Sequence, residues 1–591
     1  MIDRNRAPLV LGALVLVIIP IIAGWLAPYA GLGKDEVRHF AYLHSLVFDR
    51  DVDFANEFRA TYPKFANEPW FVEETGIPPN PSPIGPALFW LPAYLLVLLL
   101  GLDPSGFGTA SRGAAMVVSS GIFSLGVLAT WDMIRSRTEN AWASVFLVAG
   151  TSFFAYWWIF PGLFGHAIAV GLCGIYVWYW DRTLDRDDAR NWAVLGLLGG
   201  LITIVRWQNA LLPILSLAWK LQRARSARQA GIGTLAFGVA ATVAFLPQLL
   251  VWNSIYDVWL TVPQGDIGEG LGFMHWSKPY LLDTLFSPRY GLLGFSPVLY
   301  VSVIGLVIGI GRLRDPVVAL SCAYLAVALY VNASAGDWYA GATFGARRMD
   351  SAFPALVVGT WLALEGLSRI VKRRPRWLLV PVLVASVVLT GILGGAYRSQ
   401  RITPGMVGAD EFPEQASAAV LDSLGWLPSL PAELYHVTFS GTRLGQYSAL
   451  AGDDRLSWLD GVVVPQSRRL SDDWVLLPDG TARLDSDEGA IYLYLMDLGF
   501  KYRNIRLTLT FAGSADRQDP ARAGGDDPIE VRVNETRLKP TSGPTVGTQA
   551  SRRWRYVLEV PYSVWRPGIN RIDVRGRGAV LRQLRLTRND S

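Results

Sequence analysis

Two adjacent carboxylic acids, Asp35 and Glu36, directly follow the first hydrophobic run of the chain, within the sequence GKDEVRHF of residues 33–40. A carboxylate that lies where a membrane helix meets water can carry out proton transfer on a lipid-borne substrate. Acidic residues also favour the first turn of a helix, so a solvated helix start is the alternative interpretation. The pair therefore predicts either a site of proton transfer or a helix cap at the membrane surface.

The composition is typical of a membrane protein with a water-soluble part. Of the 591 residues, 51% are hydrophobic and 17% are charged, and the mean hydropathy is +0.28. The net charge of +5 is small for this length, and the basic residues cluster beside hydrophobic runs, which argues against a nucleic-acid partner. Both cysteines, Cys173 and Cys322, lie within hydrophobic runs, so we expect no disulfide and no cysteine-based metal site.

Hydrophobic runs long enough to cross a bilayer, roughly 20 residues each, predict about eleven membrane-spanning helices. The run at residues 8–29 follows Arg4 and Arg6 but lacks a signal-peptide cleavage site, so we interpret it as a retained first helix. The run at 192–221 is too long for one helix and contains the polar sequence RWQN at 206–209, which indicates two helices with a polar apex. The other runs lie at residues 112–134, 140–159, 164–181, 231–253, 292–312, 316–334, 350–370 and 375–396.

Clusters of Lys and Arg mark the cytoplasmic ends of membrane helices because these residues resist translocation. The two densest clusters lie at residues 220–228 and 369–376. If these clusters and the N-terminus share the inner side, the proline-rich run at 84–100 cannot be a complete span, and it suits a helix that lies along the outer membrane surface. The outer side then receives residues 30–111, 160–165, 206–209, 254–291, 335–349 and those after 397.

Most of the unusual polar residues of the membrane part fall in these outer segments, which predicts an active cavity on that side. They are Asp35, Glu36, His39, His166, Arg206, Arg289, Asp337, Arg347 and Arg348. We therefore expect a multi-pass protein of a bacterial-type inner membrane, with its site and its C-terminal part on the extracytoplasmic side.

The sequence changes character after Arg398. From about residue 430 onward, apolar and polar residues alternate in short stretches separated by Gly, Asp and Pro, which predicts a β-sandwich. The sequences at 554–561 and 565–574 resemble the closing strands of jelly-roll carbohydrate-binding modules. We expect a polytopic α-helical membrane domain at residues 1–397 with an outer loop at 30–111, a linker at 398–429, and an all-β jelly-roll-like domain at 430–591.

Several short sequences resemble motifs of the GT-C glycosyltransferases, membrane enzymes that use polyprenyl-phosphate sugars on the outer face of a membrane. The sequence KDEVRHFAY at residues 34–42 looks like the Asp-Glu-x-Arg-Tyr stretch of the branch with the protein O-mannosyltransferases and the lipid A aminoarabinose transferases, with His39 in place of the usual aromatic residue. Other similar sequences are DVDFANE at residues 51–57, PIGPALFW at 83–90, SPRYGLL at 287–293 and FGARR at 344–348. The resemblance covers roughly residues 8–396 and implies a GT-C fold.

The resemblance implies an inverting glycosyltransferase that moves one sugar from a polyprenyl-phosphate donor to an extracytoplasmic glycan, lipid or protein. Asp35 would take the proton of the acceptor hydroxyl, and Glu36 would bind acceptor hydroxyls or hold the loop. Arginine suits the departing phosphate because its planar fork can grip two oxygens. The candidate phosphate-binding residues are Arg347, Arg348, Arg289, Arg206 and Lys278. Interfacial anchoring of these side chains is the alternative.

Two histidines and two aromatic residues are candidates for substrate binding. His166 and His39 lie in outer segments, and Trp338 and Tyr339 could stack on a sugar ring, although histidines often fill satisfied interfacial positions and aromatic residues gather at membrane interfaces anyway. Asp35 and His39 share a helical face, but two ligands are too few for a metal site. The resemblance implies no required metal or cofactor; a divalent cation is the alternative.

Two other classes of function remain open at this stage. A transporter or flippase of lipid-linked glycans would place polar residues near the bilayer midplane and show repeats, and no repeat is visible in the sequence. A non-catalytic, glycan-binding protein of envelope assembly would use the C-terminal domain as its functional unit. Transfer of a labelled sugar would separate the first class from both of these.

Overall fold

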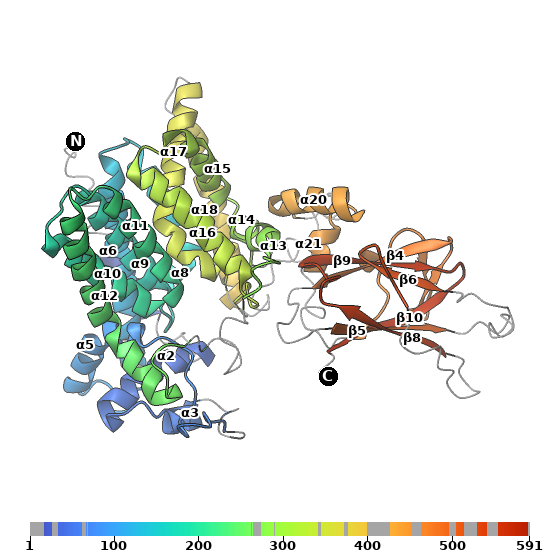
Figure 1. The fold of residues 1–591 in the computed structure, drawn as a ribbon, viewed down its shortest axis with the longest axis horizontal. Coiled ribbons are helices and arrows are strands. Elements are labelled where there is room, and N and C mark those ends of the chain that lie inside the picture. The colour runs from blue at the N-terminus through green and yellow to red at the C-terminus, as the bar shows by residue number, and fades with distance from the viewer. Residues whose placement is uncertain are drawn as a thin grey trace. The chain divides into compact units, whose positions relative to one another are not determined.

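The computed structural model describes most of the chain. The described residues are 17–26, 34–61, 65, 67, 69–261, 263, 274–288, 290–340, 344–371, 376–398, 426–451, 462–495, 504–512, 529–539 and 553–588. The chain divides into two compact units (Figure 1). Unit 1 comprises residues 1–271, 296–329 and 347–395, and unit 2 comprises residues 272–295, 330–346 and 396–591. The chain therefore passes into unit 2 twice before its C-terminal part begins.

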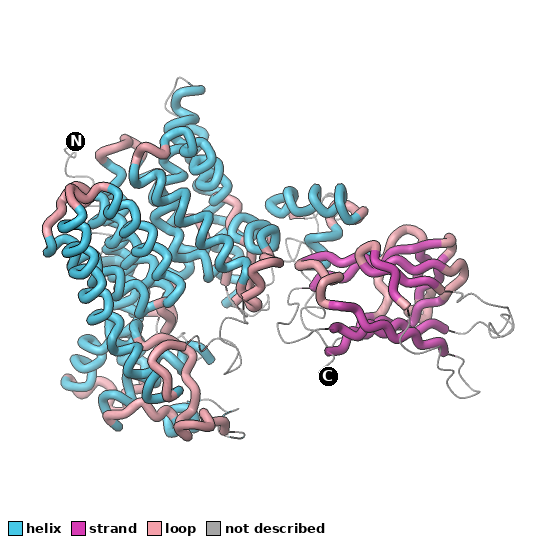
Figure 2. Tube along the Cα trace, viewed as in Figure 1, coloured by secondary structure: helices cyan, strands magenta, loops and turns pink. Residues whose placement is uncertain are grey.

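Unit 1 is built from helices, shown in cyan in Figure 2. Its first elements are α2 (Lys34–His44), the π-helix η2 (Ser45–Asp49), α3 (Ala55–Thr61) and α5 (Gly85–Leu99). They are followed by α6 (Thr109–Arg135), α7 (Ala141–Ala149), α8 (Phe153–Ile159), α9 (His166–Arg182), α10 (Ala189–Val205), η3 (Trp207–Ala210), α11 (Leu211–Gln222) and α12 (Ala227–Tyr256). The last elements are α15 (Leu299–Gly309), η5 (Ile310–Arg312), α16 (Pro316–Ser334), η6 (Arg347–Ala352), α17 (Phe353–Val371) and α18 (Arg376–Arg398).

Four helices among the described residues are long and apolar enough to cross a membrane, and five if a bent pair forms one span. The four are Thr109–Arg135, Ala227–Tyr256, Pro316–Ser334 and Arg347–Ile370. The structure thus supports a multi-pass protein, while the count of about eleven spans stays a prediction. The first predicted span, at 8–29, lies partly outside the described residues.

The predicted spans at 140–159 and 292–312 are interrupted in the structure, whereas the pair of helices predicted within 192–221 is present. The predicted span at 140–159 consists of two helices, α7 and α8, which meet at an angle of 80° and together form a broken span or a re-entrant loop. Gly150 ends α7, and the Ser152 side chain caps α8 by accepting a hydrogen bond from the Phe154 N–H. The helix expected at 292–312 is interrupted: residues 292–295 form one short helix, and α15 begins at Leu299, after Pro297. By contrast, α10 and α11 flank the polar apex at 206–209 as predicted.

Glycines allow pairs of helices in unit 1 to approach closely. A Cβ atom on Gly126 of α6 would collide with the backbone of Gly171 in α9. In the same way, a Cβ on Gly305 of α15 would overlap the backbone of Gly359 in α17. Backbone-to-backbone packing at small residues is typical of membrane helices, where lipid provides no hydrophobic driving force between them.

The basic residues that the sequence placed on the inner side form ion pairs at one end of the unit 1 helices. Arg137, just after α6, grips Asp181 in the last turn of α9 through two hydrogen bonds of 2.9 and 2.8 Å. Arg312 grips Glu365 of α17 in the same two-pronged way, at 2.8 and 3.0 Å. These contacts lie at the C-terminal ends of α6, α9 and α15, opposite the end at which α9 begins with His166.

Unit 2 contains two antiparallel sheets (Figure 1). One sheet has the strand order β2-β3-β10-β5-β8 with β1 beside β10, and the other has the order β4-β9-β6-β7. The strands are β1 (Val462–Val463), β2 (Trp474–Leu476), β3 (Ala482–Leu484), β4 (Glu488–Leu495), β5 (Asn504–Ala512), β6 (Glu530–Val533), β7 (Thr536–Leu538), β8 (Arg553–Pro561), β9 (Gly568–Arg575) and β10 (Val580–Arg588). Alternate residues from both sheets, such as Leu507, Leu584, Ile491 and Val574, share one hydrophobic core.

Within the predicted β domain, residues 430–440 and 446–451 are helical, and the first described strand begins at Val462. Unit 2 also contains the short helices α13 (Leu281–Phe286), α14 (Leu292–Phe295), η8 (Leu427–Ser429), α20 (Leu430–Ser440), α21 (Gln446–Ala451) and η10 (Ser467–Arg469). In α20 the buried residues Ala432, Glu433 and His436 follow helical spacing, and a proline at the first helical turn favours the helix start. The domain boundaries at 397 and 430 stay a prediction.

Candidate functional site

Helix α2 places Asp35 in its first turn, where the carboxylate meets two arginines. Nη1 of Arg347 donates a hydrogen bond of 3.2 Å to Oδ2 of Asp35, and Nη1 of Arg38, one turn along α2, lies 3.6 Å from Oδ1. Burial raises the pKa of Asp35, but the positive charges of Arg347 and Arg38 outweigh it and hold the pKa below its ordinary value of 3.8. Asp35 is therefore an ionised carboxylate at neutral pH, and 37% of its side chain is exposed.

A second acid, Asp350, lies fully buried beside the first pair. Oδ2 of Asp350 is 2.6 Å from Nδ1 of His166 and 2.9 Å from Nη1 of Arg206. Arg206 Nη1 also contacts the His166 ring and lies 3.5 Å from the backbone oxygen of Arg347. A buried carboxylate is stable only when its charge is paired and its oxygens accept hydrogen bonds, and both conditions hold here.

The local structure of two short segments explains why these side chains meet. Arg347 and Asp350 are three residues apart in the 3-10 helix η6, a spacing at which side chains point in the same direction. Arg206 has extended backbone angles (φ −154°, ψ 118°) that end α10, so its side chain leaves the helix at the polar apex. The Ser351 hydroxyl donates to Asn209 of this apex, which ties η6 to it.

Together these contacts form one polar cluster in unit 1, which we call the arginine–carboxylate cluster. It consists of Asp35, Arg38, His166, Arg206, Arg347 and Asp350. The segments that supply it come from α2, from the starts of α9 and η6, and from the apex after α10. Asp35 is its most exposed member, so the cluster presents an accessible carboxylate next to guanidinium groups.

The other predicted residues of unit 1 surround this cluster. Glu36 directs Oε1 toward Gly162, since a Cβ added there would lie 3.1 Å from that oxygen. His39 is buried, its Nδ1 lies 3.2 Å from the backbone oxygen of Pro83, and burial lowers its pKa to about 4, so the ring is neutral. Arg348 follows Arg347 in η6 and is near enough to Arg206 for their charges to interact.

The remaining predicted residues lie in unit 2 or outside the described chain. Lys278 donates hydrogen bonds to the backbone oxygens of Tyr562, at 2.7 Å, and Trp565, at 2.9 Å. Trp338 and Tyr339 are buried, 3% and 6% exposed, in an aromatic group in which Trp338 stacks on Tyr280. Arg289 lies outside the described residues. The binding roles of all four stay predictions.

Sequence reasoning missed Asp350, the most central member of the cluster. Its partners His166 and Arg206 are 184 and 144 residues away, so nothing in its own neighbourhood shows the contact. The available signal was its position as the first residue of the hydrophobic run at 350–370, where an acid has to be paired or solvated.

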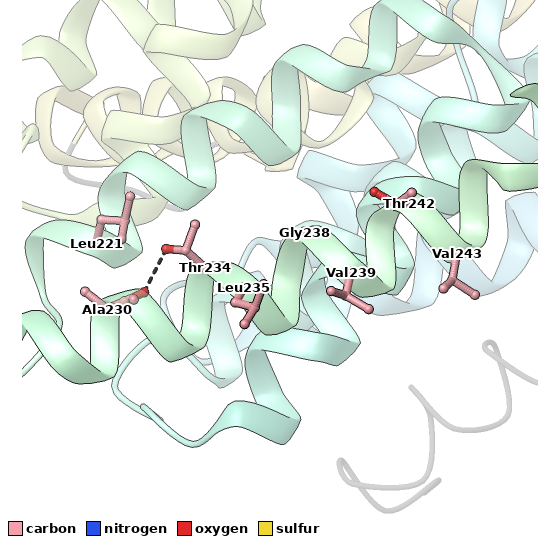
Figure 3. A pocket seen from close by; sticks show the side chains of 9 residues that line it. Leu221, Ala230, Thr234, Leu235, Gly238, Val239, Thr242 and Val243 are labelled. Atoms are coloured by element: carbon pink, nitrogen blue, oxygen red, sulfur yellow. Dashed lines mark hydrogen bonds between the residues drawn. The ribbon is translucent and has the colours of Figure 1, made fainter. Parts of the chain in front are cut away.

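An apolar hollow of about 850 Å³ lies elsewhere in unit 1, against α11 and α12 (Figure 3). It is lined by small and aliphatic residues that include Leu221, Leu235, Val239 and Val243. Leu235, Val239 and Val243 are 68%, 55% and 61% exposed, which suits a surface that faces lipid chains. None of the residues of the arginine–carboxylate cluster lines it.

Comparisons with known proteins give little beyond this geometry. No known protein family matches the sequence, and no curated protein matches it. The structure is similar to the cryo-EM structure of the arabinosyltransferase EmbB from Mycobacterium smegmatis, with a TM-score of 0.39 and 11% sequence identity over 98% of this chain. The chain spans 64% of the length of that protein. A likeness of this degree does not assign an activity.

Proposed function

We propose that the protein is an integral-membrane glycosyltransferase that moves a sugar from a polyprenyl-phosphate donor to a hydroxyl group of an extracytoplasmic glycan, lipid or protein. The contact between Asp35 and Arg347, which are 312 residues apart, supports this proposal most directly. It combines an ionised, accessible carboxylate with a guanidinium group at one end of a bundle of apolar helices. These are the two groups that transfer from a lipid phosphate requires.

The proposed reaction is a single displacement with inversion. The acceptor hydroxyl oxygen forms a bond to the anomeric carbon, and the bond between that carbon and the phosphate oxygen breaks. The hydroxyl proton passes to Asp35, and the electron pair of the broken bond leaves with the polyprenyl phosphate. A carboxylate of low pKa is a weak base, so proton transfer occurs late, when the attacking oxygen has already gained positive charge.

Arg347 connects the base to the leaving group in this mechanism. In the structure its Nη1 hydrogen-bonds to Asp35. A donor phosphodiester carries one negative charge, as a carboxylate does, and can compete for the same guanidinium group; the departing phosphate monoester gains further negative charge as the bond breaks. When Arg347 turns to the phosphate, Asp35 loses its main electrostatic partner and becomes a stronger base. Donor binding would thus activate the base at the moment it is needed.

The buried part of the cluster has a positioning role. Asp350 neutralises Arg206 and accepts the hydrogen bond from His166, and all three side chains lie directly behind Arg347. Loss of one partner from a buried charge pair typically costs about 3–5 kcal/mol because the other charge stays buried. We assign these residues the role of holding the turn that presents Arg347.

The test is transfer of label by the purified full-length protein in lipid nanodiscs, supplied with a panel of radiolabelled polyprenyl-phosphate sugars and with envelope glycans as acceptors. We expect transfer from at least one donor, with inversion at the anomeric carbon. In sealed proteoliposomes of the same protein, movement of intact labelled donor between leaflets without sugar transfer would contradict the proposal and indicate a flippase. Glycan binding without transfer from any donor would indicate a non-catalytic assembly protein.

A further inference from the structure

Three metal-ligating side chains meet at the end of α2, away from the arginine–carboxylate cluster. The ligand atoms of His44, Asp49 and Glu57 all lie within 4.8 Å of one another. Nδ1 of His44 is 2.8 Å from Oε1 of Glu57 and 3.7 Å from Oδ2 of Asp49. The three residues come from three consecutive elements, α2, η2 and α3.

The π-helix η2 is the reason that His44 and Asp49 face each other. In an α-helix, residues five apart point in different directions, whereas the wider turn of a π-helix brings them to one side. Residues Ser45–Asp49 form this turn, which Arg50 closes with a left-handed backbone (φ 61°) and a hydrogen bond to the Ser45 oxygen of 2.7 Å. Single π-turns inside helices occur frequently at functional sites.

Glu57 has a buried carboxylate. It is 1% exposed, and its Oε2 has no hydrogen-bond donor among the described residues. Nδ1 of His44 lies 2.8 Å from its Oε1, and the carboxylate of Asp49 is close enough for its negative charge to act on Glu57. A buried carboxylate next to a second carboxylate is unfavourable unless a proton or a cation lies between them.

The neighbouring side chains hold the three ligands in place. The His44 ring stacks on Phe48 at 4.5 Å between ring centres and touches Phe107 at 4.6 Å, so its orientation is fixed. The side-chain amide of Asn56 donates to Asp49 Oδ2 at 2.8 Å. Asp51, the next acid along the chain, accepts from the Ser45 hydroxyl at 2.8 Å and does not join the group.

We propose that His44, Asp49 and Glu57 bind a divalent transition-metal ion, Zn²⁺ in the first place. One imidazole nitrogen and two carboxylate oxygens match the donor preference of Zn²⁺, whereas Ca²⁺ and Mg²⁺ prefer oxygen ligands alone. Three protein ligands leave one position of a tetrahedral site for water. The ion would join the end of α2 to α3 and brace the helix that carries Asp35. This site is separate from the proposed transferase chemistry.

The test is isothermal titration of the full-length protein, prepared without a polyhistidine tag and treated with a chelator, against ZnCl₂, MnCl₂ and CaCl₂ in separate runs. We expect one equivalent of Zn²⁺ to bind and Ca²⁺ to bind more weakly. Loss of an outer-shell partner lowers metal affinity roughly 10- to 100-fold. Because Asp49 would be a direct ligand, Asp49→Asn should lower the affinity for Zn²⁺ by at least that much. Asp53→Asn is the matched control, because Asp53 lies exposed in the same loop and makes the same change of charge.

Two further measurements keep the result clear. Size-exclusion profiles and circular dichroism show whether Asp49→Asn is folded, and Glu57→Gln provides a second variant. X-ray absorption of the zinc-loaded protein should show nitrogen and oxygen ligands at about 2.0–2.2 Å. No binding by the wild type, or equal binding by wild type and Asp49→Asn, would overturn the proposal and leave a shared proton between the carboxyls. Neither arm uses sugar transfer, so the outcome is independent of the proposed function.

Discussion

Asp35 owes its properties to its neighbours rather than to its position at a helix start. A solvated cap would be exposed and paired with backbone N–H groups, whereas Asp35 is partly buried and contacts Arg347 and Arg38. The arginines keep it ionised, and they are also the groups most able to bind an anionic substrate. In the proposed mechanism, the same contact sets the charge of the base and links it to the donor.

The acid limb of the pH–rate profile should depend on Arg347. A base must be ionised, so kcat/KM of the wild type should stay constant down to about pH 4, since the pKa of Asp35 lies below 3.8. In Arg347→Gln the limb should move to higher pH because the largest lowering effect is lost, and in Arg38→Gln it should move less. Initial rates at low donor concentration between pH 3.5 and 8 provide the measurement. If the acid limb lies at the same pH in wild type and in Arg347→Gln, Arg347 does not set the pKa of the catalytic base.

At the residue scale, the sequence predicted side chains better than contacts. Asp35, His166, Arg206 and Arg347 could be singled out because they flank or interrupt hydrophobic runs, where ionisable residues are rare. Asp350 could not, since its role depends on burial and on residues far away in the chain. The sequence singled out Lys278 but could not predict its contacts. Its ammonium group donates to two backbone oxygens, and no sequence pattern indicates such partners.

Helix pairs in unit 1 depend on small residues at particular positions. The α6–α9 and α15–α17 pairs both approach at glycines whose Cβ would overlap the opposite backbone. Because α9 and η6 supply His166 and Asp350, the separation of these helices also sets the geometry of the arginine–carboxylate cluster. Element packing and site geometry are therefore coupled.

Gly126→Leu should destabilise the protein, whereas Gly121→Leu in the same helix should not. Gly126 touches the Gly171 backbone, but a Cβ at Gly121 would meet nothing within 4 Å. Overpacking of this kind costs about 1–3 kcal/mol. Thermal unfolding in detergent, followed by tryptophan fluorescence, is the measurement. Equal melting temperatures for the two variants would show that the close approach does not stabilise the pair.

At the element scale, the periodicity of hydrophobic residues predicted helices and strands, but it did not predict where a helix breaks. The polar apex at 206–209 and the strands after residue 462 were readable from composition and alternation. The bend between α7 and α8 was not, because Gly150 and Ser152 occur in an otherwise continuous apolar run. The helices at 430–451 were missed because short amphipathic segments fit both periods.

At the scale of the whole molecule, the chain returns repeatedly to build unit 2. Asp283, in the inserted segment at 272–295, accepts hydrogen bonds from the hydroxyls of Tyr447, at 2.9 Å, and Tyr494, at 2.7 Å. The predicted linear order of a membrane domain, a linker and a β domain contains no sign of this insertion. Buried hydrogen bonds between distant segments can be recognised only once the fold is known.

The stability of unit 2 should depend on pH through Asp283. Burial raises its pKa from 3.8 to about 6, although Tyr494 and Tyr447 oppose this rise. The folded state therefore favours the neutral acid, so its stabilising contribution is complete below pH 4 and disappears as the pH rises through about 6. Asp283→Asn keeps an acceptor oxygen and has no charge, so above pH 7 it should be more stable than the wild type, by at most about 3 kcal/mol.

Unfolding of wild type and Asp283→Asn between pH 4 and 8 checks this, with the exposed Asp487→Asn as the control. Wild type and Asp283→Asn should have similar free energies of unfolding at pH 4, and the difference between them should grow toward pH 8. A constant difference over the whole range would mean that the carboxyl does not titrate in the folded protein.

The most direct measurement of the central claim is sugar transfer by Asp35→Asn beside Asp53→Asn, a conservative change of an exposed acid in the same outer loop. Asparagine keeps the shape and the hydrogen bond to Arg347 but cannot take a proton. We predict that Asp35→Asn is folded, still binds the donor, and transfers sugar about 10²- to 10⁴-fold more slowly, while Asp53→Asn keeps the wild-type rate. Full transfer activity in folded Asp35→Asn would remove this carboxylate from the mechanism.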